Sequence, residues 1–409
     1  MIRRKLQHIA VCAAVAAAVT AGCSGADAEP IGVRAEGVFT DAPHGDQRGA
    51  IVSTADFDDI DTRISGSGAT AMRVEYRSTR GSDQAGTVVS GTVFTPSGDV
   101  PTGGWTVMVL AHATTGVAQG CGPSNFSDLF GSVPDVLHYL GLGFVVALPD
   151  YQGLGPADGT GRADGTGTMP YLEPATVGYN VIDAVRAARN VVPDTSMRWL
   201  AVGGSQGGQA TWAANELAGD YGDGLTLLGT ASLAPPVDLT RYSWLVRNNA
   251  LTAVERTFMP YLVVGMHSAH PDRVAVDDYL HGIVLDELPS ILSCSSRTDT
   301  ARNYVYARMQ KDDVVPDSEE AIRFLEDWLA SIRMPWQQAA APMLVMWGGQ
   351  DPIVAPQSVQ SAVDRACDLG STVFAQELPN AGHAMEGAEP VVTQWVEGRM
   401  AGHPAPDNC

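Results

Sequence analysis

One serine of this chain lies in a glycine-flanked turn that would make its hydroxyl a nucleophile. Ser205 is the centre of a Gly-x-Ser-x-Gly pentapeptide at 203–207, which occurs once in the sequence. The apolar run at 199–203 before it predicts a buried strand, and the Ala-rich segment at 206–218 after it predicts a helix. The pentapeptide alone could arise by chance, but a strand–turn–helix context favours a nucleophile elbow. Such a serine attacks acyl carbonyls.

A serine nucleophile needs a base within hydrogen-bond reach and a carboxylate that orients this base. Asp351 follows an apolar run at 342–347, and His383 follows another at 372–378. Each is therefore expected at the end of a strand. The order serine, acid, histidine is the order of the nucleophile-elbow hydrolases. We therefore predict Ser205, Asp351 and His383 as the catalytic residues.

The other acids and histidines have weaker sequence contexts. Three further aspartates lie inside a long helical insertion, and the remaining histidines lie in the leader, the insertion, the tail or away from strand ends. These residues are Asp312, Asp313, Asp317, His8, His44, His138, His267, His270, His281 and His403.

Acyl transfer also needs N–H donors for the oxyanion that develops in the transition state. The backbone N–H of Gln206 is one expected donor, because it begins the helix after the serine. The second should come from the loop after the strand at 106–111. We predict Thr114 for this role, with Thr115 as the alternative, and expect His112 to be structural.

The remaining pattern predicts an α/β fold with a mostly parallel sheet and helices on both faces, because strand-like and helix-like segments alternate. The first two strands should pair in antiparallel fashion. The expected strands are 72–78, 87–94, 106–111, 143–149, 199–203, 225–233, 342–347 and 372–378. The expected helices are 129–140, 174–191, 206–218, 356–367 and 389–399.

A mostly helical stretch at 237–340 interrupts this alternation. We interpret it as a cap inserted into a core that comprises residues 29–236 and 341–409. A cap beside the serine would bind the acyl chain of a substrate, because it carries many apolar and aromatic residues.

The overall composition excludes some classes of partner. The chain has 409 residues and a net charge of −21, which argues against nucleic acid as a partner. The acidic run at 56–61 is expected to be a solvated face. The repeat at 157–167 resembles a calcium loop but lacks the later bidentate carboxylate, so we expect a mobile surface loop. No metal or cofactor is needed for the predicted chemistry.

Residues 1–28 are expected to be a signal segment, because basic residues at 3–5 precede a short apolar stretch. Two cleavage sites compete. Cleavage before Cys23 would make a lipoprotein anchored to the membrane through that cysteine, although Thr20 departs from the usual aliphatic residue of a lipobox. Cleavage after Ala28 would release a secreted protein. We favour the lipoprotein.

Four cysteines remain after the signal segment, and an even number in an oxidising compartment predicts two disulfides. Three pairings are open from the sequence alone. The four are Cys121, Cys294, Cys367 and Cys409.

Several of these segments together resemble the secretory lipase family of fungal and actinobacterial exported lipases. The matching segments are 112–116, 121–124, 149–155, 203–208, 349–352 and 382–383. The resemblance implies an α/β-hydrolase core with a helical cap, hydrolysis of acylglycerols and other carboxylic esters, and the disulfides Cys121–Cys294 and Cys367–Cys409. The chain ends soon after its last predicted helix, so we expect no long C-terminal flap over the site.

The sequence therefore predicts an exported serine hydrolase, at the cell surface or secreted, that cleaves carboxylic esters, acylglycerols above all. A peptidase or an acyltransferase on the same core is the first alternative, because the cap decides the substrate. A surface lipid-binding protein without turnover is the second.

Overall fold

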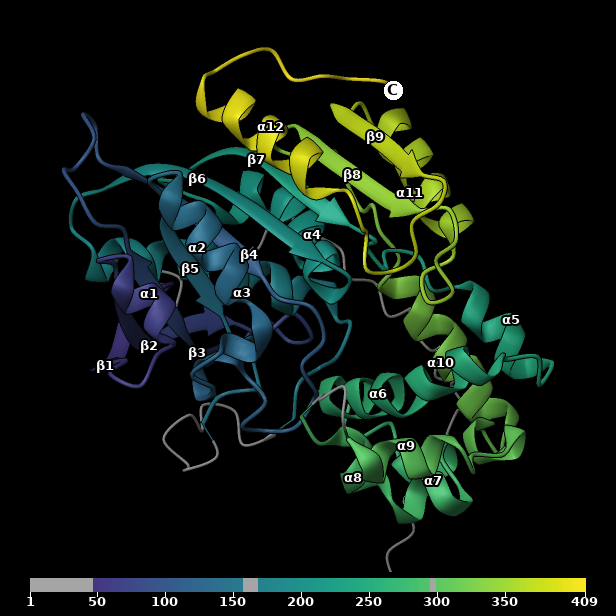
Figure 1. The fold of residues 1–409 in the computed structure, drawn as a ribbon. Helices are drawn as coiled ribbons and strands as arrows, with labels where there is room; N and C mark the ends of the chain where they lie inside the picture. The colour runs from purple at the N-terminus through teal and green to yellow at the C-terminus, as the bar shows by residue number, and fades with distance from the viewer. Residues whose placement is uncertain (1–46, 157–167, 295–298) are drawn as a thin grey trace, which may run out of the picture.

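The computed structural model describes residues 47–156, 168–294 and 299–409 (Figure 1). The signal segment with Cys23 and the repeat at 157–167 lie outside the described residues.

Nine strands of the described chain form one sheet in the order β1-β2-β3-β5-β4-β6-β7-β8-β9. The strands are β1 (Ile51–Asp56), β2 (Thr70–Thr79), β3 (Gly86–Thr95), β4 (Trp105–Ala111), β5 (Val145–Pro149), β6 (Thr195–Gly204), β7 (Thr226–Leu233), β8 (Met343–Gly348) and β9 (Val373–Leu378). Pairing is antiparallel from β1 through β3 to β5 and parallel from β5 onward. The predicted fold class, an α/β fold with a mostly parallel sheet, is confirmed.

Helices cover both faces of the sheet because alternate strand residues point to opposite sides. Along β4, Val107 and Val109 pack into one core cluster, whereas Met108 and Leu110 pack into another. Helices α3 (Pro174–Val191), α4 (Gln206–Tyr221) and α11 (Pro356–Asp368) cover the first face, and α1 (Thr62–Gly66), α2 (Val133–Gly141) and α12 (Glu389–Met400) cover the second. No helix in the described ranges is long and apolar enough to cross a membrane.

The structure differs from the expected elements of the core at three places, one of which is the short helix α1, which was not predicted. Strand β1 was not predicted, because five of its six residues are exposed and it has no apolar alternation. The helix expected at 129–140 is divided into a 3-10 turn, Leu129–Gly131, and α2. Phe130 has a φ of 56°, a left-handed conformation that no helix continues through.

The acidic run at 56–61 is mostly solvated and partly structural. Asp61 caps helix α1 and pairs with Arg63, with a distance of 2.8 Å between carboxylate oxygen and guanidinium nitrogen. Asp59 pairs with Arg73 at 3.0 Å. In the part of the chain that the structure describes, no group of three or more His, Cys, Asp or Glu side chains is arranged to hold a metal ion.

A group of helices is inserted between β7 and β8 and lies beyond the carboxyl ends of the parallel strands (Figure 1). Its buried residues, among them Leu262, Leu325 and Trp328, belong to the same core cluster as the α3 face of the sheet. The insertion therefore packs as an extension of that core. Its helices are α5 (Arg241–Arg247), α6 (Ala253–Ala269), α7 (Gly282–Asp286), α8 (Leu288–Leu292), α9 (Thr300–Tyr306) and α10 (Glu319–Ser331).

Two disulfides occur in the structure, with the pairings that the family resemblance implied. Cys121–Cys294 joins the loop after β4 to the segment that follows α8. Cys367–Cys409 joins α11 to the last residue of the chain. The tail before Cys409 lies along β9, where the backbone N–H of Asn408 donates to the carbonyl of Val373 at 3.0 Å. The tail therefore covers the outer edge of the sheet.

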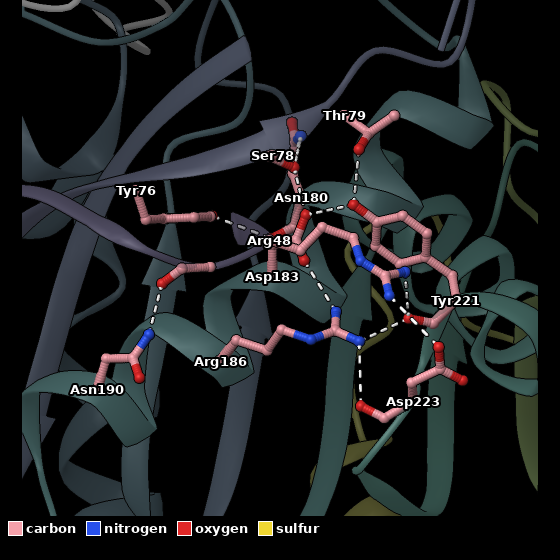
Figure 2. Close-up of polar contacts among 11 residues, drawn as sticks. Arg48, Tyr76, Ser78, Thr79, Asn180, Asp183, Arg186, Asn190, Tyr221 and Asp223 are labelled. Atoms are coloured by element: carbon pink, nitrogen blue, oxygen red, sulfur yellow. Dashed lines mark hydrogen bonds and ion pairs between the residues drawn. The ribbon is translucent and has the colours of Figure 1, made fainter. Parts of the chain in front are cut away.

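A buried carboxylate fastens β2 to α3 and α4 (Figure 2). Asp183 is fully buried and accepts hydrogen bonds from Ser78 at 2.9 Å and from the Tyr221 hydroxyl at 2.6 Å. Arg186 supplies its counter-charge at 2.9 Å. Arg48 lies over the Tyr221 ring, 4.3 Å from its centroid. Burial raises the pKa of Asp183, and these partners offset part of that cost.

A second buried carboxylate holds the end of the insertion against the core. Glu216 of α4 accepts hydrogen bonds from the Trp212 indole at 2.6 Å and from the backbone N–H of Trp336 at 2.8 Å. Burial raises the pKa of Glu216 to about 7, although these hydrogen bonds lower it in part.

This raised pKa predicts a pH dependence of stability. A carboxyl whose pKa is higher in the folded state contributes stability below its unfolded pKa of 4.5, and this contribution is lost as the pH rises through about 7. Between pH 4.5 and pH 7 the natural protein should therefore lose up to about 3 kcal/mol of its free energy of unfolding relative to Glu216→Gln, which has no carboxyl to ionise. Urea unfolding at several pH values measures this difference, and a constant difference would contradict the prediction.

Candidate active site

Ser205 occupies a strained turn between β6 and α4. Its φ of 54° and ψ of −122° are values that non-glycine residues rarely adopt. The Ser205 backbone N–H donates to the carbonyl of Leu233 in β7 at 2.8 Å, which holds the turn against the neighbouring strand. The strain presents the hydroxyl at the carboxyl end of the sheet, where a nucleophile elbow needs it.

Two glycines permit this turn, as the sequence predicts. A Cβ at Gly207 would lie 1.8 Å from the carbonyl oxygen of Ala111 in β4. A Cβ at Gly203 would lie 2.3 Å from the carbonyl oxygen of Gly207. Any side chain at either position would therefore separate α4 from the two strands that support it.

The structure brings Ser205, His383 and Asp351 together in one hydrogen-bonded chain. Nε2 of His383 lies 2.9 Å from Oγ of Ser205, and Nδ1 lies 2.7 Å from Oδ2 of Asp351. Asp351 follows β8 and His383 follows β9, two neighbouring parallel strands. The carboxyl ends of parallel strands meet at one edge of the sheet, so residues far apart in sequence converge here.

Hydrogen bonds fix the orientation of the Asp351 carboxylate that contacts the His383 imidazole. Its side chain is 1% exposed, and its other oxygen accepts from the backbone N–H groups of Ile353 at 2.8 Å and Val354 at 3.0 Å. With both oxygens engaged, the carboxylate keeps one orientation toward His383. The His383 side chain is 21% exposed, so its Nε2 face remains accessible to a substrate.

The two predicted oxyanion donors belong to the residue after the serine and to the loop after the neighbouring strand β4. Gln206 is the first residue of α4, and its side chain is buried. The loop with Thr114 leaves β4 at Ala111, which pairs with Gly203 of β6. The Thr114 hydroxyl is hydrogen-bonded at 2.8 Å to Tyr171, which lines the same pocket as Ser205.

His112 in the same loop is buried and lies between two backbone carbonyls. Nδ1 is 2.6 Å from the oxygen of Ala113, and Nε2 is 3.2 Å from the oxygen of Asp150. Its ring stacks on Tyr151 with 4.3 Å between centroids. Burial lowers the pKa of His112 to about 4, so it is neutral at neutral pH. These contacts position the loop.

Sequence reasoning missed Asp150, whose backbone carbonyl contacts His112 and whose carboxylate joins β3 to the segment at 122–124. Asp150 is fully buried and accepts from the Ser90 hydroxyl at 2.5 Å and from the backbone N–H of Ser124 at 2.8 Å. Burial raises its pKa. An aspartate directly after the fully apolar strand β5 was the signal that could have identified it.

Ser205 opens onto a small apolar pocket. Its free volume is about 20 Å³, and the insertion closes one side of it through Phe258 and Leu262 of α6. Tyr171, Leu172, Pro236, Leu239, Tyr242, Ile353 and Val354 complete the lining. Most of these residues come from loops, so no periodic pattern in the sequence identified them.

A larger groove of about 710 Å³ lies on another side of the serine. It includes Gly204 and Ala384, the chain neighbours of Ser205 and His383, together with the loop at 112–115. Ser205 therefore lines an apolar pocket, and a more polar groove begins at its chain neighbour Gly204.

The sheet topology, the serine turn and the later acid and histidine define the chain as an α/β-hydrolase. The family model described as secretory lipase matches residues 134–408. The chain therefore belongs to the secretory lipase family, and it is a carboxylic-ester hydrolase.

Solved structures of two other proteins have the same fold. Candida antarctica lipase A in its closed state superposes with a TM-score of 0.69 at 17% identity, covering 89% of this chain and 85% of that one. A ligand-bound form of LipA, a rice cell wall degrading esterase from Xanthomonas oryzae, gives a TM-score of 0.66 at 19% identity, covering 87% and 97%. Among curated proteins, no sequence matches this chain.

Proposed function

We propose that this protein is an exported esterase that cleaves acylglycerols and related carboxylic esters through an acyl-enzyme on Ser205. One observation carries the proposal: the hydrogen-bonded chain from Ser205 through His383 to Asp351, with distances of 2.9 and 2.7 Å. These are the distances that transfer of a proton from a nucleophile to its base requires.

In the proposed mechanism, the Ser205 oxygen attacks the acyl carbonyl while Nε2 of His383 accepts its proton. Asp351 orients the imidazole and stabilises its charged form. The backbone N–H groups of Gln206 and Thr114 hold the oxyanion of the tetrahedral intermediate. His383 then donates the proton to the departing alkoxide. Water repeats the sequence on the acyl-enzyme and releases the acid and the free serine.

We take residues 237–340 as a cap on a core that comprises residues 29–236 and 341–409. The small apolar pocket, which this cap helps to line, supports binding of the acyl chain by the cap. A free volume of about 20 Å³ holds little more than one water-sized group. A long acyl chain would have to displace Phe258 or Leu262. We therefore infer a preference for short acyl chains.

Family membership and the two disulfides support export. Lipid anchoring through Cys23, rather than full secretion after cleavage behind Ala28, remains our proposal from the sequence. Mass spectrometry of the mature N-terminus distinguishes a diacylated Cys23 from a free residue 29.

The direct test of the proposed function is hydrolysis of p-nitrophenyl acetate, butyrate, octanoate and palmitate, with tributyrin, triolein and aminoacyl amides beside them. We expect butyrate and tributyrin to be cleaved fastest and the amides to resist cleavage. Faster cleavage of the amides would instead support a peptidase. Ester binding without turnover would support a lipid-binding protein, and acyl transfer to an added alcohol that exceeds hydrolysis would support an acyltransferase.

Truncating the side chain of one pocket residue should change which acyl-chain length the enzyme prefers. Phe258→Ala removes the ring that closes the pocket and should raise the ratio of octanoate to butyrate kcat/KM about tenfold, because one methylene contributes about 1–3 kcal/mol in such pockets. Val254→Ala on the same helix is the control, because Val254 is 42% exposed and does not line the pocket. An unchanged ratio in Phe258→Ala would place the acyl chain elsewhere.

A further inference from the structure

The groove of about 710 Å³ beside the serine has walls from three separate parts of the fold. One wall is the loop at 112–115 after β4. The second is formed by residues 130–139, the turn before α2 and α2 itself. The third is formed by residues 384–392, which lead from His383 into α12. The groove is therefore bounded by both loops that the proposed mechanism uses.

Its position places it on the leaving-group side of the site. Ser205 itself lines the apolar pocket, whereas its neighbour Gly204 and the residue after His383, Ala384, line the groove. A Cβ added at Gly204 would meet no heavy atom within 4 Å, so the groove wall is open right beside the nucleophile. The alcohol of an ester departs toward His383, which protonates it, and so departs toward this groove.

Two carboxylates line the groove, one from each of two walls. Asp135 lies in the first turn of α2, and Glu389 is the first residue of α12. Loss of solvent around Asp135 is the main cause that raises its pKa. The negative charge of Glu389 raises it further, which indicates that the two carboxylates are near each other, and His138 lowers it. Neither forms a salt bridge with any residue in the described ranges. Both are therefore available as hydrogen-bond acceptors.

A third polar group in the groove is buried and unpaired. Thr115 is only 5% exposed, and its hydroxyl has no hydrogen-bond partner within the described chain. A buried hydroxyl without a partner is costly, and a ligand hydroxyl would satisfy it. Between these polar groups lie the apolar side chains of Tyr139, Met385 and Val392. Such a lining fits a ligand with several hydroxyls on a carbon frame.

We propose that this groove is the binding site for the alcohol part of the ester and that it selects a neutral polyhydroxylated alcohol, with Asp135, Glu389 and Thr115 as its hydrogen-bonding partners. The two carboxylates disfavour an anionic leaving group, and vicinal hydroxyls donate to carboxylates. The proposal rests on the proposed ester hydrolysis at Ser205. A glycerol backbone and a sugar share this chemistry.

The test compares butyrate esters that differ only in their alcohol: ethyl butyrate, glyceryl monobutyrate, glucose monobutyrate and butyrylcholine. The variants are Asp135→Asn, Glu389→Gln and the double variant, which preserve side-chain shape and so minimise folding defects. Glu386→Gln is the control, because this exposed carboxylate lies in the same loop outside the groove. The measured quantity is kcat/KM for each ester divided by kcat/KM for ethyl butyrate.

We expect the ratio for the polyhydroxylated esters to fall about three- to tenfold in each single variant and further in the double variant, while Glu386→Gln leaves it unchanged. A fall confined to glyceryl monobutyrate identifies glycerol as the alcohol, a fall confined to the glucose ester identifies a sugar, and a fall in both identifies polyhydroxylated alcohols in general.

Two results would overturn the proposal. One is an unchanged ratio in the double variant. The other is a larger fall for butyrylcholine than for either polyhydroxylated ester, because the groove would then select positive charge. These results differ from failure of the proposed function itself, in which the natural protein would not hydrolyse ethyl butyrate at all.

Discussion

Replacing Ser205 by alanine is expected to lower kcat for butyrate esters by about 10⁴- to 10⁶-fold. The Ser205 oxygen is the atom that forms the acyl-enzyme in the proposed mechanism, and no other described serine is hydrogen-bonded to His383. The residual rate would come from water attacking an ester that the oxyanion donors still polarise. Hydrolysis of p-nitrophenyl butyrate measures the loss.

Loss of folding must be separated from loss of the nucleophile. The thermal midpoint of Ser205→Ala should not fall, because alanine leaves the turn intact and removes only the hydroxyl. The exposed Ser127→Ala is the matched control and should keep full activity. A fluorophosphonate should label the natural protein and Ser127→Ala but not Ser205→Ala. If Ser205→Ala kept more than a hundredth of the natural rate, the acyl-enzyme on this residue would be wrong.

Replacing Asp183 by alanine is expected to lower the free energy of unfolding by about 3–5 kcal/mol, the largest effect on stability that we predict. The change leaves the buried hydroxyl of Ser78 without its acceptor and removes the carboxylate that balances the charge of Arg186. It also removes the acceptor of the Tyr221 hydroxyl, although this hydroxyl keeps its hydrogen bond with Thr79 of β2 (Figure 2). Urea unfolding measures the difference.

An exposed ion pair provides the comparison. Asp83→Ala removes a carboxylate that is 51% exposed and pairs with Arg80 at 2.7 Å. Such a pair contributes less than about 1 kcal/mol. If both variants lost the same amount of stability, burial of the Asp183 network would have no special energetic role. Catalytic constants of the folded fraction of Asp183→Ala should stay near the natural values, because Asp183 lines neither the pocket nor the groove beside Ser205.

The sequence indicates which three residues the fold brings together, because each leaves a local signal. Ser205 lies between a strand pattern and a helix pattern, and Asp351 and His383 each follow an apolar run of strand length. Parallel pairing then brings the three strand ends to one edge. The roles of the three residues remain a proposal that kinetics must test, but their convergence is a property of the fold.

The parts that the sequence does not predict depend on tertiary contacts. Strand β1 is exposed along its length, so only its pairing with β2 defines it. Helix α2 starts late because Phe130 adopts a left-handed conformation inside an otherwise helical pattern. The groove residues Asp135 and Glu389 are more than two hundred positions apart and meet only when α2 and α12 cover the same face of the sheet.

The disulfide between Cys121 and Cys294 closes a covalent ring that contains Ser205 but neither Asp351 nor His383. A protease that cuts one peptide bond within this ring therefore leaves a single covalently connected molecule. The nucleophile stays attached to the segment that carries its acid and base. Outside the cell, where proteases act and disulfides persist, this connection would let a nicked molecule retain all its parts. Only a reducing agent would then release the fragments.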